Sequence, residues 1–261
     1  MLSPYPAADF PSQATAIVTG AGSERGIGRA TAHRLAREGW AVAVLDLDQD
    51  TTDRVATEIT DTHGVPALGL GLDVRDQDQV GAAVERVVAE MPQLVGLVNN
   101  AGVSSPVPFL EVAGEEWDRV VDINLRGTFL VSQAAARVMA QHRLGRIVNI
   151  SSTSAQRGGA VYSLAAYAAS KAGVIGLAKT LARELGPLGI TANTVSPGAI
   201  DTDIMGGRLT DDRKEVMLKD LPVGRVGTVD DVAHVIAFLL GPEAGYLTGV
   251  TYDVNGGSHI A

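Results

Sequence analysis

The predicted fold is decided by the stretch Ala14-Thr-Ala-Ile-Val-Thr-Gly-Ala-Gly-Ser-Glu-Arg-Gly-Ile-Gly28. It opens with a short apolar run, Ala14–Thr19, and a helical pattern begins at its end, over about Gly28–Glu38. The glycine-rich turn between them lets the backbone approach a pyrophosphate, which the free N–H groups at a helix N-terminus bind. Strand, turn and helix in this order predict a nucleotide-binding α/β fold.

An acidic residue stands where such a fold would bring it to the nucleotide. Asp46 ends the second apolar run and lies 18 residues beyond Gly28. There its carboxylate can accept hydrogen bonds from both hydroxyls of an adenosine ribose. The alternative is an aspartate that caps the next helix or is solvated.

The alternation of apolar runs and helical patterns continues along the whole chain. Most of the runs are apolar nearly throughout, which is typical of parallel strands covered by helices on both faces. We therefore predict an α/β fold: a single doubly wound, Rossmann-type domain with a seven-stranded, mostly parallel sheet. The expected strands are Ala14–Thr19, Ala41–Asp46, Ala67–Leu72, Leu94–Asn99, Arg146–Ile150, Thr191–Val195 and Val250–Asp253, and the expected helices are about Gly28–Glu38, Thr51–Thr62, Gln77–Ala89, Glu115–Gln141, Ala165–Leu185 and Val229–Leu240.

The ends and one long irregular segment complete the predicted organisation. Residues 1–13 are expected to form a loose N-terminal extension, and residues 14–261 to form the domain. The segment of about 200–226 is rich in Asp, Gly and charged residues. Irregular segments of this length are usually binding loops, so we call residues 200–226 the lid and expect it to cover the substrate.

Composition excludes several classes of protein. The net charge of −9 argues against nucleic acid and anionic membranes as partners. No run of 18 apolar residues suggests a membrane span, and the proline-rich N-terminus does not resemble a signal peptide, so we expect a cytoplasmic location. The chain has no cysteine, and its five histidines lack metal-ligand spacing, so no metal site is expected.

The sequence Tyr167-Ala-Ala-Ser-Lys171 places a phenol and an ammonium on one face of a predicted helix. A cation held beneath a tyrosine favours its phenolate and lowers its pKa, which makes a general acid/base usable near neutral pH. The lysine can also donate hydrogen bonds to hydroxyls of a sugar or cofactor ribose. A half-buried tyrosine beside a solvated lysine is the structural alternative.

Several motifs together resemble the short-chain dehydrogenase/reductase family, over about residues 14–257. The glycine turn is similar to the family's T-G-x-x-x-G-x-G, with five residues in place of three between Gly20 and Gly26. Asp73-Val74 resembles the pair used against adenine, and Asn99-Asn-Ala-Gly102 matches the family's N-N-A-G. Ser196-Pro-Gly-Ala-Ile-Asp-Thr202 resembles its P-G-x-x-x-T, although Thr202 could also cap a following helix.

The resemblance implies four catalytic residues: Asn124, Ser152, Tyr167 and Lys171. Family spacing alone would select Ser154 as the serine, but the end of the preceding predicted strand favours Ser152. The resemblance also implies that cofactor-binding residues are Gly20, Ser23, Arg25, Gly26, Ile27, Gly28, Asp46, Asp73, Val74, Asn100, Ala101, Gly102, Tyr167, Lys171, Pro197, Gly198, Ile200 and Thr202.

The choice of cofactor depends on two residues of opposite charge. Arg25 precedes Gly26, where relatives that prefer NADP carry an arginine for the 2′-phosphate, whereas Asp46 would repel that phosphate. An arginine without a phosphate can turn to solvent or pair with Asp46, so we predict NAD.

The resemblance implies an NAD-dependent oxidoreductase that interconverts a secondary alcohol, or a polyol or sugar alcohol, and its ketone, with Tyr167 as general acid/base. Two alternatives are an NADPH-dependent 3-oxoacyl-carrier reductase and a non-catalytic dinucleotide-sensing protein. Like many relatives, the chain is expected to form a homotetramer through its two long helices and last strand. The walls of the pocket are expected to be residues 102–109, residues 156–164 and the lid. Val161, Tyr162 and Leu164 suggest that one wall is partly apolar. Arg157 is expected to be either solvated or paired with an anionic substrate.

Overall fold

A parallel sheet forms the centre of the structure, a computed structural model that describes residues 10–159, 163–205, 207 and 209–260. The strand order is β3-β2-β1-β4-β5-β6-β7, and each neighbouring pair is parallel. The predicted α/β fold with a seven-stranded sheet is confirmed. The strands are β1 (Thr15–Thr19), β2 (Ala41–Asp46), β3 (Ala67–Gly71), β4 (Leu94–Asn99), β5 (Gly145–Ile150), β6 (Ile190–Pro197) and β7 (Thr251–Val254).

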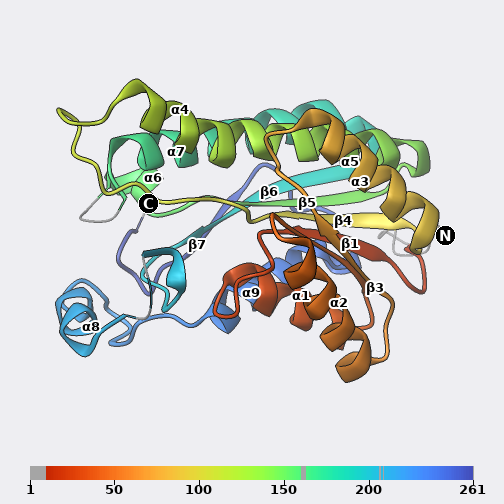
Figure 1. The fold of residues 1–261 in the computed structure, drawn as a ribbon, viewed down its shortest axis with the longest axis horizontal. Coiled ribbons are helices and arrows are strands. Elements are labelled where there is room, and N and C mark those ends of the chain that lie inside the picture. The colour runs from red at the N-terminus through yellow and green to blue at the C-terminus, as the bar shows by residue number, and fades with distance from the viewer. Residues whose placement is uncertain (1–9, 160–162, 206, 208, 261) are drawn as a thin grey trace.

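Helices cover both faces of this sheet (Figure 1). Alternate residues of β1 point to opposite faces: Val18 packs in the apolar cluster that includes α1, α2 and α9, and Ile17 packs in the cluster that includes α3, α5 and α7. Both clusters are built mainly from Ala, Val, Leu and Ile. The helices are α1 (Ile27–Arg37), α2 (Gln49–His63), α3 (Gln77–Glu90), α4 (Gly114–Val121), α5 (Gly127–His142), α6 (Ser154–Arg157), α7 (Ala165–Leu185), α8 (Asp211–Leu218) and α9 (Val229–Leu240).

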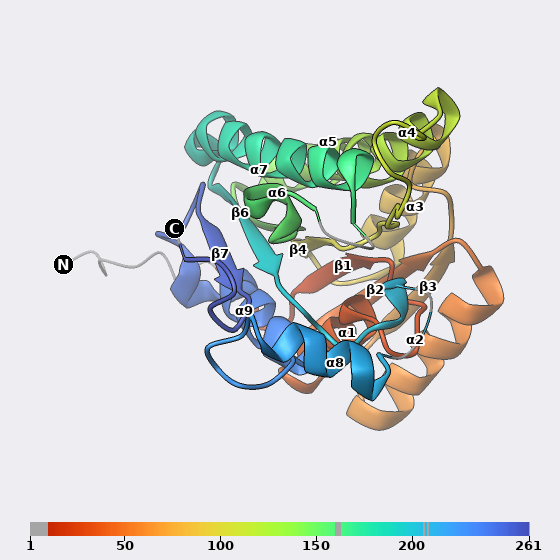
Figure 2. The ribbon, with the colours of Figure 1, turned by 90° about the vertical axis from the view of Figure 1, so that its left-hand side faces the viewer.

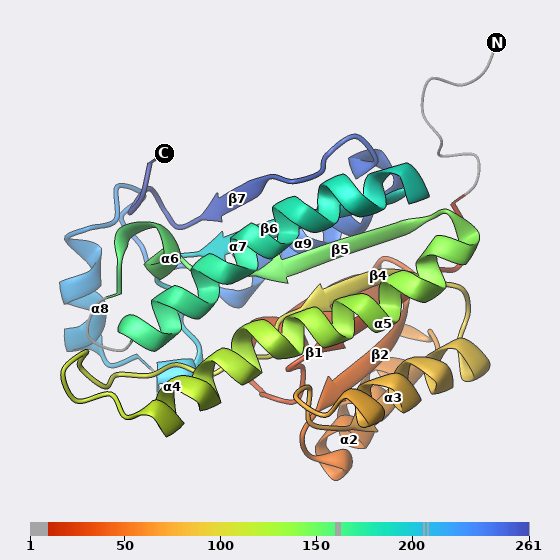
Figure 3. The same ribbon diagram turned by 90° about the horizontal axis from the view of Figure 1, so that it is seen from above.

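The strands end together at one edge of the sheet, which is where the candidate site lies. Figure 3 shows their arrowheads directed toward the end of the molecule that carries α6 and α8, and Figure 2 shows this end facing the viewer. β1 lies between β2 and β4, so the chain leaves its carboxyl end on one side and returns on the other. Such a switch point opens a crevice in which doubly wound folds bind ligands.

Two expectations, about one helix and about the lid, need correction. The predicted helix Glu115–Gln141 is divided by a π-helical turn, Asp122–Arg126, between α4 and α5. The lid is not wholly irregular, since it contains a 3₁₀ turn, Asp203–Met205, and α8. The sequence gives no sign of α8, because this helix buries none of its residues and therefore has no apolar periodicity.

One residue of the predicted N-terminal extension packs against the domain. Phe10 packs edge-on against Trp40, with ring centroids 5.7 Å apart, and its ring also faces the Arg146 guanidinium. Phe10 therefore belongs to the packed structure, while residues 1–9 of the expected extension lie outside the described residues. No helix in the part of the chain that the structure describes is long and apolar enough to span a bilayer.

Candidate functional site

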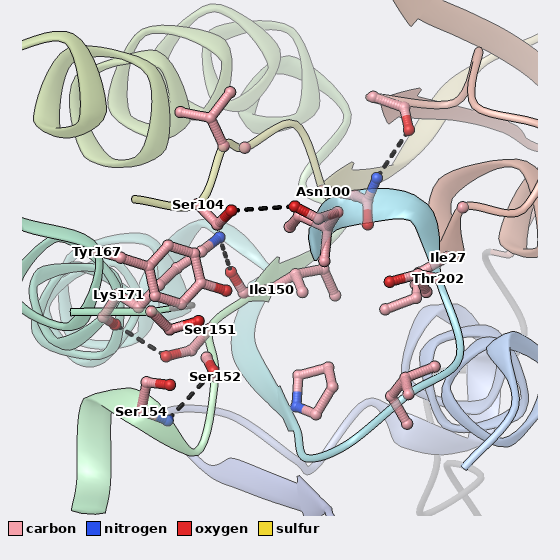
Figure 4. Close-up of a pocket in the computed structure, with 18 of the residues that line it drawn as sticks. Ile27, Asn100, Ser104, Ile150, Ser151, Ser152, Ser154, Tyr167, Lys171 and Thr202 are labelled. Carbon is pink, nitrogen blue, oxygen red and sulfur yellow. Dashed lines mark hydrogen bonds between the residues drawn. The ribbon is translucent and has the colours of Figure 1, made fainter. Parts of the chain in front are cut away.

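A cavity of about 770 Å³ lies at the carboxyl ends of the strands. It extends from Asp46, at the end of β2, to Tyr167 and Lys171 in α7, and residues of the lid border it on a further side. Figure 4 shows Tyr167, Lys171 and Ser152 gathered on one side of this pocket, with Ile27 and Thr202 across from them. The cavity thus joins the predicted cofactor-binding and catalytic regions.

The glycine turn is held in place by the end of β4. The Asn100 side chain donates hydrogen bonds to the carbonyl oxygens of Thr19 (3.0 Å) and Gly20 (2.9 Å). Gly20 has a φ of +64°, and a Cβ on it would lie 2.7 Å from the Ala101 Cα. A Cβ on Gly28 would lie 2.3 Å from the Gly20 carbonyl oxygen, so larger residues do not fit at either position.

The N-terminus of α1 opens toward the cavity. Its N-cap, Gly26, forms no side-chain cap hydrogen bond, and both Gly26 and Ile27 border the cavity. Backbone N–H groups at such an uncapped helix start, beside glycines that allow close approach, fit a pyrophosphate.

Asp46 is positioned by backbone donors. One of its carboxylate oxygens accepts a hydrogen bond from the Gly22 N–H at 2.7 Å, and the other accepts one from the Leu47 N–H at 2.8 Å. Each carboxylate oxygen has a second lone pair, so Asp46 can still accept hydrogen bonds from a ribose in the cavity it borders. Together with the glycine turn, this arrangement fits the adenosine half of a dinucleotide.

Asp73 and Val74 border the same end of the cavity. Arg75 donates to both carboxylate oxygens of Asp73, from Nε at 3.0 and 2.9 Å and from Nη2 at 2.6 Å. These hydrogen bonds hold the pKa of Asp73 below its usual value, against the opposing effect of partial burial. Both side chains are therefore charged near neutral pH, and their opposite charges nearly cancel.

Tyr167 and Lys171 lie on one face of α7, and both border the cavity. Both side chains are buried, with exposed fractions of 7% and 3%. The Lys171 Nζ donates to the Ile150 carbonyl oxygen at 2.8 Å and lies 5.9 Å from the centroid of the Tyr167 ring. Ser152 hydrogen-bonds with the Tyr167 hydroxyl, and its Oγ accepts the Ser154 N–H at 3.2 Å.

Burial shifts the pKa of Tyr167 and that of Lys171 in the directions that favour the uncharged side chains. It raises the pKa of Tyr167, and the hydrogen bond with Ser152 offsets only part of this effect. Burial also lowers the pKa of Lys171 to about 8. The expected lowering of the Tyr167 pKa by Lys171 is therefore not found here: desolvation raises this pKa, and the opposing effect comes from Ser152.

Asn124 lies inside the π-helical turn and is fully buried. Its side-chain amide donates to the Val103 carbonyl oxygen and to the Ser170 Oγ, both at 3.0 Å, and its side-chain oxygen accepts the Val103 N–H at 2.8 Å. The side chain does not border the cavity. Asn124 instead fixes the segment after β4 against α7, and a Cβ on Gly102 would lie 3.1 Å from its side-chain oxygen.

Comparison with known proteins assigns almost the whole chain to one family. A family model described as "Enoyl-(Acyl carrier protein) reductase" matches residues 20–259. An uncharacterized short-chain type dehydrogenase/reductase of Sinorhizobium fredii is 40% identical over 246 residues, which cover 94% of this chain and 97% of that protein. The chain belongs to the short-chain dehydrogenase/reductase family.

Two further relatives agree with this assignment. The 3-oxoacyl-[acyl-carrier-protein] reductase of Staphylococcus aureus is 42% identical over 246 residues, covering 94% of this chain and 98% of that protein. The crystal structure of a short-chain type dehydrogenase/reductase from Mycobacterium marinum matches with a TM-score of 0.88 and 33% identity, and covers 95% of this chain and 96% of that one. This family of oxidoreductases acts on CH–OH and keto groups and uses NAD or NADP.

Most of the expected cofactor-binding residues border the cavity, but Arg25 and Gly28 do not. Gly28 packs beneath the glycine turn. Arg25 neither turns to solvent nor pairs with Asp46, the two arrangements expected from the sequence. Its Nη2 donates to Asp201 in the lid at 2.6 Å, because the lid brings a carboxylate next to the turn. The residues in contact with the cavity are Gly20, Ser23, Gly26, Ile27, Asp46, Asp73, Val74, Asn100, Ala101, Gly102, Tyr167, Lys171, Pro197, Gly198, Ile200 and Thr202.

The substrate end of the cavity includes an ion pair that the sequence does not reveal. Arg157 pairs with Asp220 in the lid and also donates to the Ser258 carbonyl oxygen, so it is neither merely solvated nor unpaired. The Ser104 Oγ donates to the Ile204 carbonyl oxygen at 3.0 Å, a further contact between the body and the lid. Val161 and Tyr162, expected in the pocket wall, lie outside the described residues, and Leu164 does not border the cavity.

Proposed function

We propose that this family member is an NAD-dependent oxidoreductase that interconverts a secondary alcohol, or a polyol or sugar alcohol, and its ketone. The observation that carries the proposal is one continuous cavity. It has a carboxylate, Asp46, at one end and the hydrogen-bonded pair of Ser152 and Tyr167 at the other. The first group suits an unphosphorylated ribose, and the second suits proton transfer to or from a substrate oxygen.

In this proposal Tyr167 exchanges a proton with the substrate oxygen. A nicotinamide held in the cavity would accept or supply the hydride. Because burial raises the pKa of Tyr167, the phenol is protonated near neutral pH and can donate to an oxygen that gains negative charge during ketone reduction. In the reverse direction Tyr167 must first lose its proton to solvent, and the phenolate then accepts the proton of the alcohol.

Ser152 would donate a hydrogen bond to the same substrate oxygen and so fix its position. Its Oγ is directed by the Ser154 N–H, which occupies one of its lone pairs. Lys171, already anchored to the Ile150 carbonyl oxygen, has two further N–H donors for the nicotinamide ribose when it is protonated. Asn124 acts as a positioning residue, since its amide holds the Val103 backbone beside the cavity.

The preference for NAD is supported by the charges around the ribose end. A 2′-phosphate would lie against the Asp46 carboxylate, and the resulting repulsion disfavours NADP. Arg75 and Arg25 both already have carboxylate partners, Asp73 and Asp201 respectively. The sign of the local charge therefore favours a cofactor with free ribose hydroxyls.

The substrate end supports a small, hydroxylated substrate. It is bordered by the side chains of several serines and by the Arg157–Asp220 ion pair, with apolar contact from Met217 and Leu221. Serine hydroxyls can donate and accept hydrogen bonds, so they match the hydroxyl groups of a polyol. The ion pair leaves little net charge to attract an ionic substrate.

A spectrophotometric screen tests this proposal. Purified protein is incubated with NAD and a panel of secondary alcohols, polyols and hydroxy acids, and NADH formation is followed; Tyr167→Phe is assayed in parallel. We expect turnover with members of the first two groups and a loss of kcat of about 10²–10⁴-fold in Tyr167→Phe with NADH binding retained, because only proton transfer is removed. Undiminished turnover by Tyr167→Phe would refute the mechanism.

A second candidate is an NADPH-dependent 3-oxoacyl-carrier reductase, which the name of the Staphylococcus aureus relative favours. Arg25 is compatible with it if the Asp201 ion pair opens. Oxidation of NADPH in the presence of a 3-oxoacyl-carrier substrate, with kcat/KM above the value for NADH, would support this candidate over the first.

We also propose a homotetramer. Large apolar side chains are exposed on α4 and α5 (Trp117 at 38%, Phe129 at 43%) and on α9 (Phe238 at 50%), where a partner subunit would bury them. Light scattering coupled to size-exclusion chromatography measures the mass, and a monomeric mass at micromolar concentration contradicts this expectation.

A further inference from the structure

The strongest unexplained contact near the cavity joins the glycine turn to the lid. The Arg25 Nη2 donates to the Asp201 Oδ1 at 2.6 Å, and the Arg25 Nε lies 3.8 Å from the Asp203 Oδ1. Arg25 and Asp201 are 176 positions apart in the sequence. The lid therefore holds the guanidinium of a residue that stands inside the predicted phosphate-binding turn.

Asp201 is positioned independently of Arg25. Its backbone N–H donates to the Gly227 carbonyl oxygen at 3.0 Å. Its Oδ2 accepts a hydrogen bond from the Lys214 Nζ at 3.0 Å. Because the Asp201 backbone is held in place without Arg25, the Asp201 carboxylate determines where the Arg25 guanidinium lies.

Without this partner, Arg25 has the ribose end of the cavity within reach. Gly26, its immediate neighbour, borders the same cavity as Asp46, and consecutive Cα atoms are about 3.8 Å apart. Gly22, three residues before Arg25, donates its N–H to Asp46 at 2.7 Å. A long arginine side chain released at this turn could extend to a group bound beside Asp46, and guanidinium binds phosphate through two parallel hydrogen bonds.

We propose that Asp201 is a cofactor-specificity residue, which selects against the 2′-phosphate of NADP by holding Arg25 in the lid. Asp46 then excludes the phosphate by repulsion, and Asp201 removes the nearby cation that would compensate. This inference rests on the proposed function in one respect: the cavity must hold a nicotinamide dinucleotide.

The test measures binding of NADH and NADPH by nicotinamide fluorescence, without substrate, in the wild type, Asp201→Asn and Asp201→Ala. We expect the ratio of the NADPH to the NADH dissociation constant to fall at least about fivefold in both variants, because a charge-assisted phosphate contact becomes available. The double variant Arg25→Ala/Asp201→Ala should return to the ratio of Arg25→Ala. An unchanged ratio in both Asp201 variants, or an equal fall in the double variant, would overturn the proposal.

Two control variants separate this effect from general disturbance of the lid. Lys214→Met removes the other cation of Asp201, and Asp220→Asn breaks the Arg157 ion pair elsewhere in the lid. Both should leave the ratio within about twofold of wild type, since Arg25 stays paired with Asp201; a comparable fall in either would overturn the proposal. If the wild type binds NADPH more tightly than NADH, the proposed NAD preference is wrong. The role of Asp201 is tested independently of this result, because it is judged from the change in the ratio between the variants and the wild type.

Discussion

Lys171 is anchored to the sheet through the carbonyl oxygen of Ile150, the last residue of β5, which accepts its Nζ hydrogen bond at 2.8 Å. The contact ties α7 to the strand end from which Ser151 and Ser152 follow. The Ser151 Oγ donates in turn to the Lys171 carbonyl oxygen at 2.8 Å. Two hydrogen bonds in opposite directions therefore fix the relative positions of the serine turn and the Tyr167–Lys171 face of α7.

The two candidate serines make different contacts, and we predict different effects of removing them. Ser152→Ala should lower kcat by about 10²-fold, because Ser152 hydrogen-bonds with Tyr167 and would donate to the substrate oxygen. Ser154→Ala keeps the backbone N–H that Ser152 accepts, so its kcat should stay near the wild-type value. Steady-state kinetics of the two variants decide the assignment, and a larger loss in Ser154→Ala would reverse it.

The buried Lys171 predicts a specific pH dependence of stability. Burial lowers its pKa from 10.5 to about 8 in the folded protein. Between these values the unfolded chain binds a proton that the folded protein does not, so the free energy of unfolding rises with pH over this interval. Relative to Lys171→Met, the wild type should gain up to roughly 3 kcal/mol between pH 8 and pH 10.5.

Urea unfolding at several pH values between 7.5 and 10.5 measures this difference. Lys179→Met is the matched control, since Lys179 is a solvent-exposed lysine on the same helix, and its curve should run parallel to that of the wild type. If the curve of Lys171→Met is also parallel to that of the wild type, Lys171 titrates alike in the folded and unfolded states, which contradicts the prediction.

Close packing beneath the glycine turn makes Gly28 intolerant of a side chain. In Gly28→Ala the new Cβ would meet the Gly20 carbonyl oxygen at 2.3 Å and the Asn100 Nδ2 at 2.5 Å. We expect displacement of the turn, weaker NADH binding and a loss of stability. Gly81→Ala in α3 meets nothing within 4 Å and should stabilise the protein by about 0.5–1 kcal/mol; unimpaired NADH binding by Gly28→Ala would contradict the role of the turn.

Asp46 is predicted to bind the ribose of the cofactor. Asp46→Asn should weaken NADH binding by about tenfold and NADPH binding less, because it removes both the charged acceptor and the repulsion of a 2′-phosphate. Asp48→Asn, two residues further on, is the control: Asp48 caps α2 by accepting the Thr51 N–H, which asparagine also does. Equal losses for both cofactors in Asp46→Asn would show that Asp46 does not discriminate between them.

The sequence alone determined the layered α/β architecture and the neighbourhood of the site. Strand runs that are apolar throughout require helices on both faces, and residues at the ends of parallel strands must gather at one edge of the sheet. For this reason Asp46, the last residue of β2, and Asn100, which follows β4, both border one cavity. The i and i+4 spacing of Tyr167 and Lys171 likewise required a shared helix face.

Only the tertiary structure decided the charges and protonation of the site. Arg25 and Asp201 are 176 residues apart, and Arg157 and Asp220 are 63 residues apart, so no local pattern indicates that they pair. The direction of the Tyr167 pKa shift depends on burial by surrounding segments, which spacing along one helix does not reveal. Electrostatic energies depend on distance and desolvation in three dimensions, whereas periodicity reports only which face of an element is apolar.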